Sequence, residues 1–344
     1  MAVTLAGSDV VGDPADILAW GDALFEGPVL TELDEAGFRE KRARFLDEMG
    51  WEDFEEAARR FELRDATLRR RSAEEEIVVW LSTDLFDQLQ LLQVLERAAR
   101  LNATVSVAVG VGEPMDLDNA SPTEFRRHFD GRRRVGEDAL REASDRWVLL
   151  GSADPIAIER AARVQSTALP HVPPALLRLL AELPSRQTGL GRTDEAILRA
   201  VDDGASGFYE VYGGMMRAEE RPFMSPGLMA SALDRLAEGP VPLVSYTEGE
   251  PAEGTDTWTF TELVSITAAG RSVLAGADDA VTLRGIDRWI GGLISPDTQH
   301  LSAGTGKPGR WSAPADARAG LGRFGCGCRL GRSLGGGFRG SAVV

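Results

Sequence analysis

The chain has 344 residues, of which 43% are hydrophobic and 27% are charged, and its formal net charge is −16. This length fits about two domains of roughly 100–200 residues each, and the composition is that of a globular protein with a buried core. The acidic charge argues against a general nucleic-acid binder, because contacts to phosphates dominate that affinity. No apolar run reaches the roughly 18 residues of a membrane span, so we expect no membrane partner.

The first twenty residues do not resemble a secretory signal. They contain three aspartates and no lysine or arginine, whereas such a signal has a basic start followed by an apolar run. We therefore expect a cytoplasmic protein. Cys326 and Cys328 have no second pair of cysteines, so neither a disulfide framework nor a four-ligand zinc site is expected.

Three apolar stretches near the start of the chain are predicted to be strands. They are residues 17–20, 77–81 and 105–111. The second is a continuous β-branched and aromatic run without alternation, which is typical of a strand covered on both faces. The first is the shortest of the three.

A helix is predicted between the second and third strands. Residues 85–99 place their apolar side chains on one helical face, and Asp84 or Thr83 can cap the first free N–H groups. Strand, helix and strand within about 35 residues form a βαβ unit, which implies parallel strands and a right-handed crossover. Together with an amphipathic helical stretch at 33–60, this pattern predicts a Rossmann-like α/β domain over residues 1–135.

The chain then becomes helical, and its second half is predicted to be an α+β domain. Residues 136–186 are expected to form a helical connection interrupted by prolines. The later elements are helices at 193–201, 226–237 and 267–274 and strands at 243–247 and 258–265. This order predicts a winged-helix-like domain over residues 187–292, although a plain α+β module has the same pattern.

The last segment, residues 293–344, is predicted to be a mostly disordered tail rich in Gly and Arg. From residue 301 onward it has seven basic residues and one acidic residue, a net charge of +6, in an otherwise acidic chain. Such a segment buries too little apolar surface to offset the entropy of ordering it. A frameshifted reading of a G+C-rich gene and a genuine basic tail for an acidic partner both explain this composition.

Four phrases spread over residues 17–292 carry a family resemblance. They are Trp20-Gly-Asp22-Ala-Leu-Phe-Glu26-Gly-Pro28, Trp80-Leu-Ser-Thr-Asp84-Leu-Phe-Asp87-Gln88-Leu89, Gly189-Leu-Gly-Arg-Thr193 and Arg288-Trp-Ile-Gly-Gly292. Their order and spacing resemble the bacterial family known as domain of unknown function 1835, with its companion C-terminal domain. Members of that family have no settled activity, so the resemblance implies no reaction. The chain departs from the family pattern at both ends.

Carboxylates follow two of the predicted strands. Asp22 and Glu26 come after the first strand, and Asp84 and Asp87 come after the second. In open α/β sheets ligands bind beyond the carboxyl ends of the strands, and carboxylates there can hold Mg²⁺ together with substrate phosphates. Asp22, Asp84 and Asp87 are the candidate metal ligands. The alternative is structural: Asp84 caps the helix, and Asp87 is favourable in its first turn because of the helix dipole.

Four further residues are candidates for ligand binding. Trp20 and Gln88 belong to the same two phrases as these carboxylates, although Trp20 also suits a core or a pocket wall. Arg126 and Arg127 lie in a run of arginines. Guanidinium groups can clamp phosphate through two hydrogen bonds, but such a run is also typical of a solvated surface.

Two further functions, nucleophilic catalysis and DNA binding, have little support in the sequence. Against nucleophilic catalysis, the three histidines, His128, His171 and His300, are far apart in the sequence, and no Gly-x-Ser-x-Gly elbow is present. Residues 187–276 have six arginines against fourteen acidic residues, a net charge of −8, whereas a DNA-recognition surface needs a positive stripe.

The leading hypothesis is therefore binding of a phosphorylated or nucleotide-like ligand at the acidic strand ends of the N-terminal domain. A regulatory or protein-interaction protein that uses the winged-helix-like half is the first alternative. A metal-dependent phosphoester hydrolase is the second. The sequence does not decide whether the protein is an enzyme.

Overall fold

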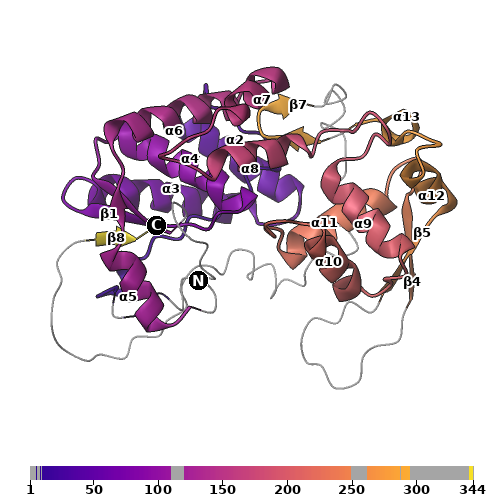
Figure 1. Cartoon of the computed structure of the whole chain (residues 1–344), viewed down its shortest axis with the longest axis horizontal. Helices are drawn as coiled ribbons and strands as arrows, with labels where there is room; N and C mark the ends of the chain where they lie inside the picture. Colours follow the sequence, from indigo (N-terminus) through magenta and orange to yellow (C-terminus); the bar gives the residue numbers. More distant parts are fainter. Residues whose placement is uncertain are drawn as a thin grey trace.

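The computed structural model describes residues 5, 8, 10–109, 120–248, 262–286, 288–294 and 341–343. It has a mixed α/β fold in which helices predominate. The helices of the N-terminal half are α2 (Glu35–Glu48), α3 (Phe54–Arg71), α4 (Leu85–Arg100), α5 (Pro122–Asp130), α6 (Glu137–Leu150), α7 (Pro155–Arg163) and α8 (Val172–Leu180). Those of the C-terminal half are α9 (Arg192–Asp202), α10 (Phe208–Arg217), α11 (Pro226–Ala237), α12 (Ala268–Leu274) and α13 (Ala280–Arg284). Figure 1 shows the two halves side by side.

The main sheet has the strand order β3-β2-β1-β8. Its strands are β1 (Glu76–Trp80), β2 (Val105–Val109), β3 (Arg133–Arg134) and β8 (Ser341–Val343). β1 is parallel to both β2 and β8, whereas β3 is antiparallel to β2. The strands predicted at 77–81 and 105–111, the helix between them and their parallel pairing are therefore confirmed.

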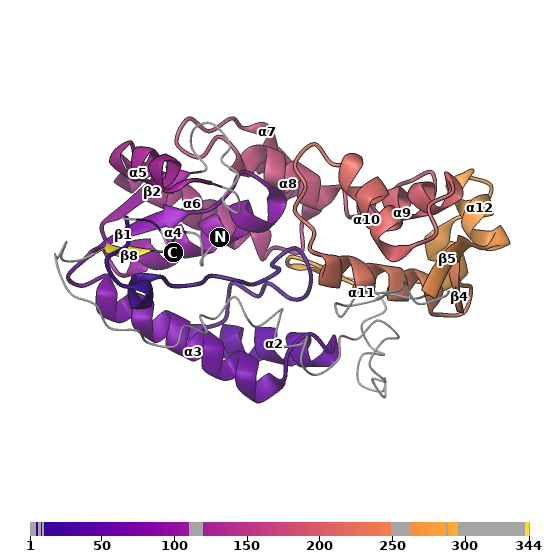
Figure 2. The ribbon, with the colours of Figure 1, turned by 90° about the horizontal axis from the view of Figure 1, so that it is seen from below.

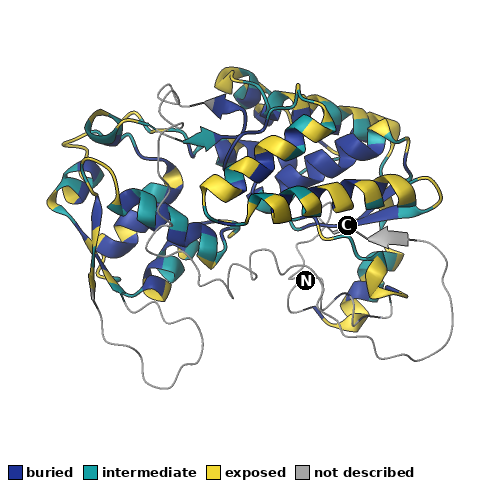
Figure 3. Ribbon diagram, turned by 180° about the vertical axis from the view of Figure 1, so that it is seen from behind, coloured by how far each residue is buried: buried dark blue, intermediate teal, exposed yellow. Residues whose placement is uncertain are grey.

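The core lies on both faces of this sheet. Ile77 and Val79 point into the main hydrophobic core with α4, while Val78 and Trp80 point into a smaller cluster with Phe125 of α5. α4 is buried on nearly all sides, because α6 and α8 also pack against it. Figure 2 shows α2 and α3 as a further layer, and Figure 3 shows the buried residues gathered in the inner helices.

Three details of the predicted N-terminal half are corrected. The stretch at 17–20 forms no strand beyond a bridge residue at Ile17, and β8 occupies the edge of β1 instead. The helical stretch at 33–60 is two helices, because Gly50 takes a positive φ of 66° and Asp53 caps the start of α3. The region at 136–186 packs on α4 and so belongs to the same helical layer.

The C-terminal half contains the expected helices and a β-hairpin. The hairpin strands are β4 (Val244–Glu248) and β5 (Glu262–Ile266), which pair antiparallel, and Gly207 before α10 adds a single bridge to Leu263. α10, α13 and a short hairpin of β6 (Trp289–Ile290) and β7 (Leu293–Ile294) were not expected from the sequence. Of the tail predicted over 293–344, residues 293–294 belong to β7 and 341–343 form β8, while 295–340 and 344 lie outside the described residues.

None of the helices in the described part of the chain combines the length and the hydrophobicity that a membrane span requires.

Candidate functional site

Asp22 pairs with an arginine in the interior. Arg42 donates from Nε to Asp22 Oδ2 over 3.0 Å, and both side chains are 1% exposed. The same guanidinium donates to the carbonyl oxygens of Glu26 and Ala23. Asp22 therefore orients Arg42, which in turn holds the loop that follows Trp20 against α2.

Glu26 belongs to a largely buried network of charged and polar residues between the two halves, here called the joint network. Its members are Glu26, Arg178, Glu182, Thr193, Asp194, Glu219, Arg235 and Arg288. Arg288, just before β6, contacts Glu26 and lies 2.9 Å from Glu182. Figure 1 shows α8 on one side of this joint and α9 and α11 on the other. Three of the four family-like phrases contribute a member to the network.

The charges in the joint network stabilise one another. Burial alone would raise the pKa of Glu182, but the guanidinium groups of Arg288 and Arg178 overcome this effect and lower it to about 2. Burial would likewise lower the pKa of Arg288, yet Glu26 and Glu182 keep it well above its ordinary value. Both residues are therefore ionised at neutral pH, as a buried pair with good hydrogen bonds can be.

Asp84 and Asp87 have the structural roles that the alternative hypothesis gave them. Asp84 caps α4 by accepting from the backbone N–H of Asp87 over 3.1 Å. Asp87 accepts from the backbone N–H of Ser82 over 2.6 Å, and Gln88 donates to the Ser82 carbonyl oxygen. Burial raises the pKa of the Asp84 carboxyl. These contacts fix the turn between β1 and α4.

The candidate metal ligands do not form a metal centre. Within the described residues, no group of three or more His, Cys, Asp and Glu side chains is arranged to hold a metal ion. Asp22 is paired with Arg42, while Asp84 and Asp87 bind backbone N–H groups of their own turn. The magnesium hypothesis therefore has no geometric support here.

Trp20 is a core residue with a polar partner. Its Nε1 donates to Gln93 Oε1 over 2.8 Å, and the Arg64 guanidinium lies 4.0 Å from its ring centroid. Burial lowers the pKa of Arg64 to about 10, with the nearby charge of Arg97 contributing and Asp65 opposing. Trp20 thus anchors the loop before α2 to α3 and α4.

Arg126 and Arg127 lie on α5, which covers the opposite face of the sheet from α4. Arg126 pairs with Asp130 at 3.9 Å and Arg127 contacts His128 at 3.4 Å. They are thus separated by the sheet from the helical layer that contains the other candidates.

Arg221 lies at the carboxyl end of β1, and the sequence analysis does not single it out. Arg221 follows α10, and its Nη1 donates to the carbonyl oxygen of Thr83 over 3.1 Å and lies 3.2 Å from His171 Nδ1. No carboxylate among the described residues pairs with its guanidinium. No local pattern points to this position, because Arg221 stands between Glu220 and Pro222 without a recognisable motif.

Comparison of the chain with protein-family models, with curated proteins and with solved structures found no match.

Proposed function

We propose that this chain binds a phosphorylated or nucleotide-like ligand at the carboxyl end of β1, with Arg221 as the residue that holds a phosphate. The observation that carries this proposal is the setting of Arg221. Its guanidinium is half-buried, lies at Thr83 just before α4, and has no carboxylate partner among the described residues. A cation in this position is available to an incoming anion.

The surroundings of Arg221 support an anionic ligand. Guanidinium groups match the geometry of phosphate with two parallel hydrogen bonds. The N-terminus of α4 adds partial positive charge at the same place, and ligands of open α/β sheets bind beyond the carboxyl ends of the strands. Asp84 and Asp87 are carboxylates of the same turn. Burial raises the pKa of Asp84, so this carboxyl is easier to neutralise beside an anion.

Aromatic side chains next to this position offer a surface for a base-like ring. Phe25 lies between Phe86, in the first turn of α4, and Phe223, two residues after Arg221, with ring centroids 6.2 and 5.1 Å away. Phe86 and Phe223 are half-buried. Rings of this kind can pack edge-on or face-on against a nucleobase, which favours a nucleotide over inorganic phosphate.

A thermal-shift screen of the full-length protein tests the proposal. The probes are ATP, ADP, AMP, GTP and inorganic phosphate, because a ligand that binds only the native state raises the melting temperature. Arg221→Gln should abolish the shift. Arg217→Gln, which replaces an exposed arginine at the end of α10, should keep it. No shift with any of these probes, or an equal shift in the Arg221 variant, would refute the proposal.

We also propose that the N-terminal half is Rossmann-like and that the C-terminal half is winged-helix-like, as the order of the elements predicted from the sequence indicates. The βαβ unit supports the first assignment. The order α9, Gly207 bridge, α10, α11 and β4–β5 hairpin supports the second.

The packing of α11 against the rest of the chain favours a role for the winged-helix-like half in contacts within the protein, and not in DNA binding. α11 occupies the position of a recognition helix, yet Trp51 of the N-terminal half donates to its Ser231 over 2.7 Å, and Arg235 pairs with Asp194 at 2.9 Å. With the local charge of −8, we expect no appreciable duplex binding at physiological salt. Tight duplex binding by the full-length protein would contradict this expectation.

A further inference from the structure

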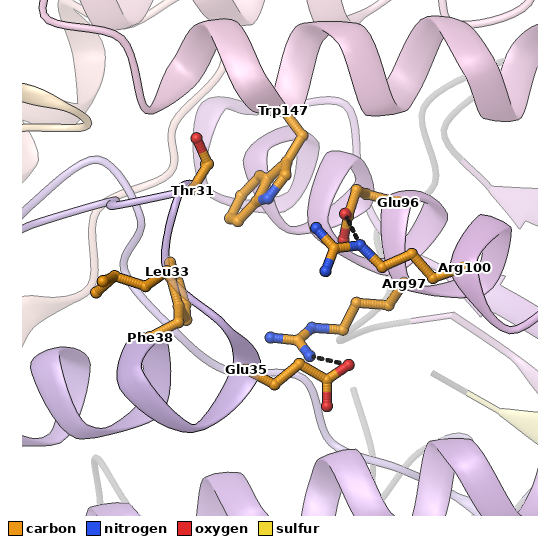
Figure 4. A pocket seen from close by; sticks show the side chains of 8 residues that line it. All are labelled: Thr31, Leu33, Glu35, Phe38, Glu96, Arg97, Arg100 and Trp147. Carbon is orange, nitrogen blue, oxygen red and sulfur yellow. Dashed lines mark ion pairs between the residues drawn. The ribbon is translucent and has the colours of Figure 1, made fainter.

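A small recess lies between the start of α2, the end of α4 and α6, away from the Arg221 position. Its enclosed part has room for about one water-sized particle, so it excludes phosphate and organic molecules. Arg97 and Arg100 line it from α4, and Trp147 lines it from α6. Figure 4 shows the guanidinium groups of both arginines directed toward the space below the Trp147 ring.

Arg97 provides a buried donor without an acceptor. Its side chain is 7% exposed, and its Nε has no hydrogen-bond partner among the described residues. Glu35 and Asp65 hold its Nη1 at 3.1 and 3.5 Å, so the guanidinium is fixed while Nε remains available. A buried donor without an acceptor is costly, and an acceptor in the recess would remove that cost.

The other nitrogen atoms at the recess are also donors. Guanidinium and indole N–H groups donate hydrogen bonds and accept none, and Figure 4 shows the indole nitrogen of Trp147 on the side of the ring that faces Arg100. The carboxylates that line the recess already have partners, because Glu35 accepts from Arg69 over 2.7 Å and Glu96 pairs with Arg100. The recess therefore offers mainly hydrogen-bond donors to a small guest.

The ion pairs around the recess have an excess of positive charge. The two carboxylates of its lining, together with Asp65 behind them, form seven ion pairs in which five arginines meet three acids. The arginines are Arg39, Arg64, Arg69, Arg97 and Arg100, and the acids are Glu35, Asp65 and Glu96. Burial and the additional repulsion from Arg97 lower the pKa of Arg64 to about 10. A single negative charge between these helices would reduce the repulsion.

From the size, the donors and the charge of the recess we propose that it is a halide site that takes chloride. The ion accepts from Arg97 Nε, from the Arg100 guanidinium and from the Trp147 indole N–H. A water molecule also accepts from such donors but leaves the excess positive charge in place, whereas an anion offsets part of it. The bound ion ties the first turns of α2 to the end of α4 and to α6.

Thermal denaturation of the full-length protein at constant ionic strength tests the proposal. Sodium chloride or sodium bromide replaces sodium gluconate stepwise, because an ion that binds only the native state raises the melting temperature. Gluconate is too large for the recess, so the melting temperature should rise as halide replaces it. At a halide concentration about fivefold above the dissociation constant the rise should be about 1–2 °C. Crystals soaked in bromide should show an anomalous peak in the recess.

Arg100→Gln should remove most of the halide-dependent rise. The substitution takes away one donor and leaves the Glu96 carboxylate at the recess without its partner, at a side chain that is 55% exposed and so tolerates the change. Arg44→Gln is the matched control on α2, because Arg44 forms the same type of i,i+4 ion pair, with Glu40, and is also 55% exposed. This variant should keep the full rise. Arg221→Gln should keep it too, which separates this site from the phosphate site. Equal rises in the wild type and the Arg100 variant, or soaked crystals without a bromide peak in the recess, would overturn the proposal.

Discussion

Arg288 and Glu26 form an ion pair across 262 positions of the chain, and each of these side chains is 10% exposed. Through Glu182, which lies 2.9 Å from Arg288 and is fully buried, the pair is connected to α8. A residue of the loop before α2 and the residue just before β6 thus meet inside the protein. The two halves are joined by charges that have little access to water.

Removing the positive charge of Arg288 should destabilise the protein strongly. Arg288→Met leaves Glu26 and Glu182 buried without their shared partner, and breaking a buried ion pair in this way costs about 3–5 kcal/mol. Urea denaturation followed by circular dichroism measures the change. Arg271→Met is the control, because the Arg271–Asp202 pair is 62% and 42% exposed and should contribute no more than about 1 kcal/mol. A similar, small effect of both substitutions would contradict the prediction.

The lowered pKa of Glu182 predicts a specific acid sensitivity. Its pKa in the folded protein is about 2, against an ordinary value of 4.5, so its contribution is complete above pH 4.5 and is lost as the pH falls toward 2. We expect the difference in melting temperature between wild type and Glu182→Gln to be largest at neutral pH and to shrink over this range. A difference that stays constant from pH 7 to pH 2 would show that Glu182 does not titrate in this way.

Asp84 should behave as a helix cap. Asp84→Ala removes the acceptor of the Asp87 N–H at the start of α4 and should cost roughly 1 kcal/mol, whereas Asp84→Asn retains an acceptor and should cost less. The exposed cap of α3, Asp53, provides the comparison. Thermal denaturation of Asp84→Ala, Asp84→Asn, Asp53→Ala and Asp53→Asn compares the loss of stability caused by Ala and by Asn at each position. If Asn is as damaging as Ala at position 84, the carboxylate charge has another role.

Trp20 and Gln93 should show energetic coupling. Trp20→Phe removes the indole donor and leaves Gln93 Oε1 buried without it, which should cost about 1–3 kcal/mol. Adding Gln93→Leu removes the orphaned acceptor and should recover part of this loss. A double-mutant cycle from urea denaturation measures the coupling, and strictly additive effects would argue that the hydrogen bond contributes nothing.

The sequence predicted those elements whose signals are local. β1, α4 and β2 have hydrophobic patterns that need no distant partner, and the Asp84 cap lies directly before its helix. α10 was missed because Gly213 and Gly214 weaken its helical pattern. A Cβ on Gly214 would lie 2.6 Å from the Cβ of Ala200, so this glycine allows α9 and α10 to approach closely, which a one-dimensional pattern does not reveal.

The candidate site was only partly predictable, because charges find their partners through the fold. Asp22 and Glu26 were recognised as important carboxylates, yet their partners Arg42 and Arg288 are 20 and 262 positions away. Arg288 opens one of the four family-like phrases, but nothing local marks it as the partner of Glu26, and no local feature distinguishes Arg42 from the many other arginines of the chain. The position of Arg221, where no described carboxylate pairs with it, likewise depends on the segment after α10 reaching Thr83.

The ion pair between Glu26 and Arg288 also has a consequence for synthesis on the ribosome. A ribosome adds roughly 5–20 residues per second, so Glu26 emerges on the order of tens of seconds before its partner exists. During that time the carboxylate of Glu26, in the loop before α2, must stay hydrated. Its final buried position is not yet closed off from water. The nascent N-terminal half therefore reaches its final packing only after Arg288, and the later strand β8 that pairs with β1, have been translated.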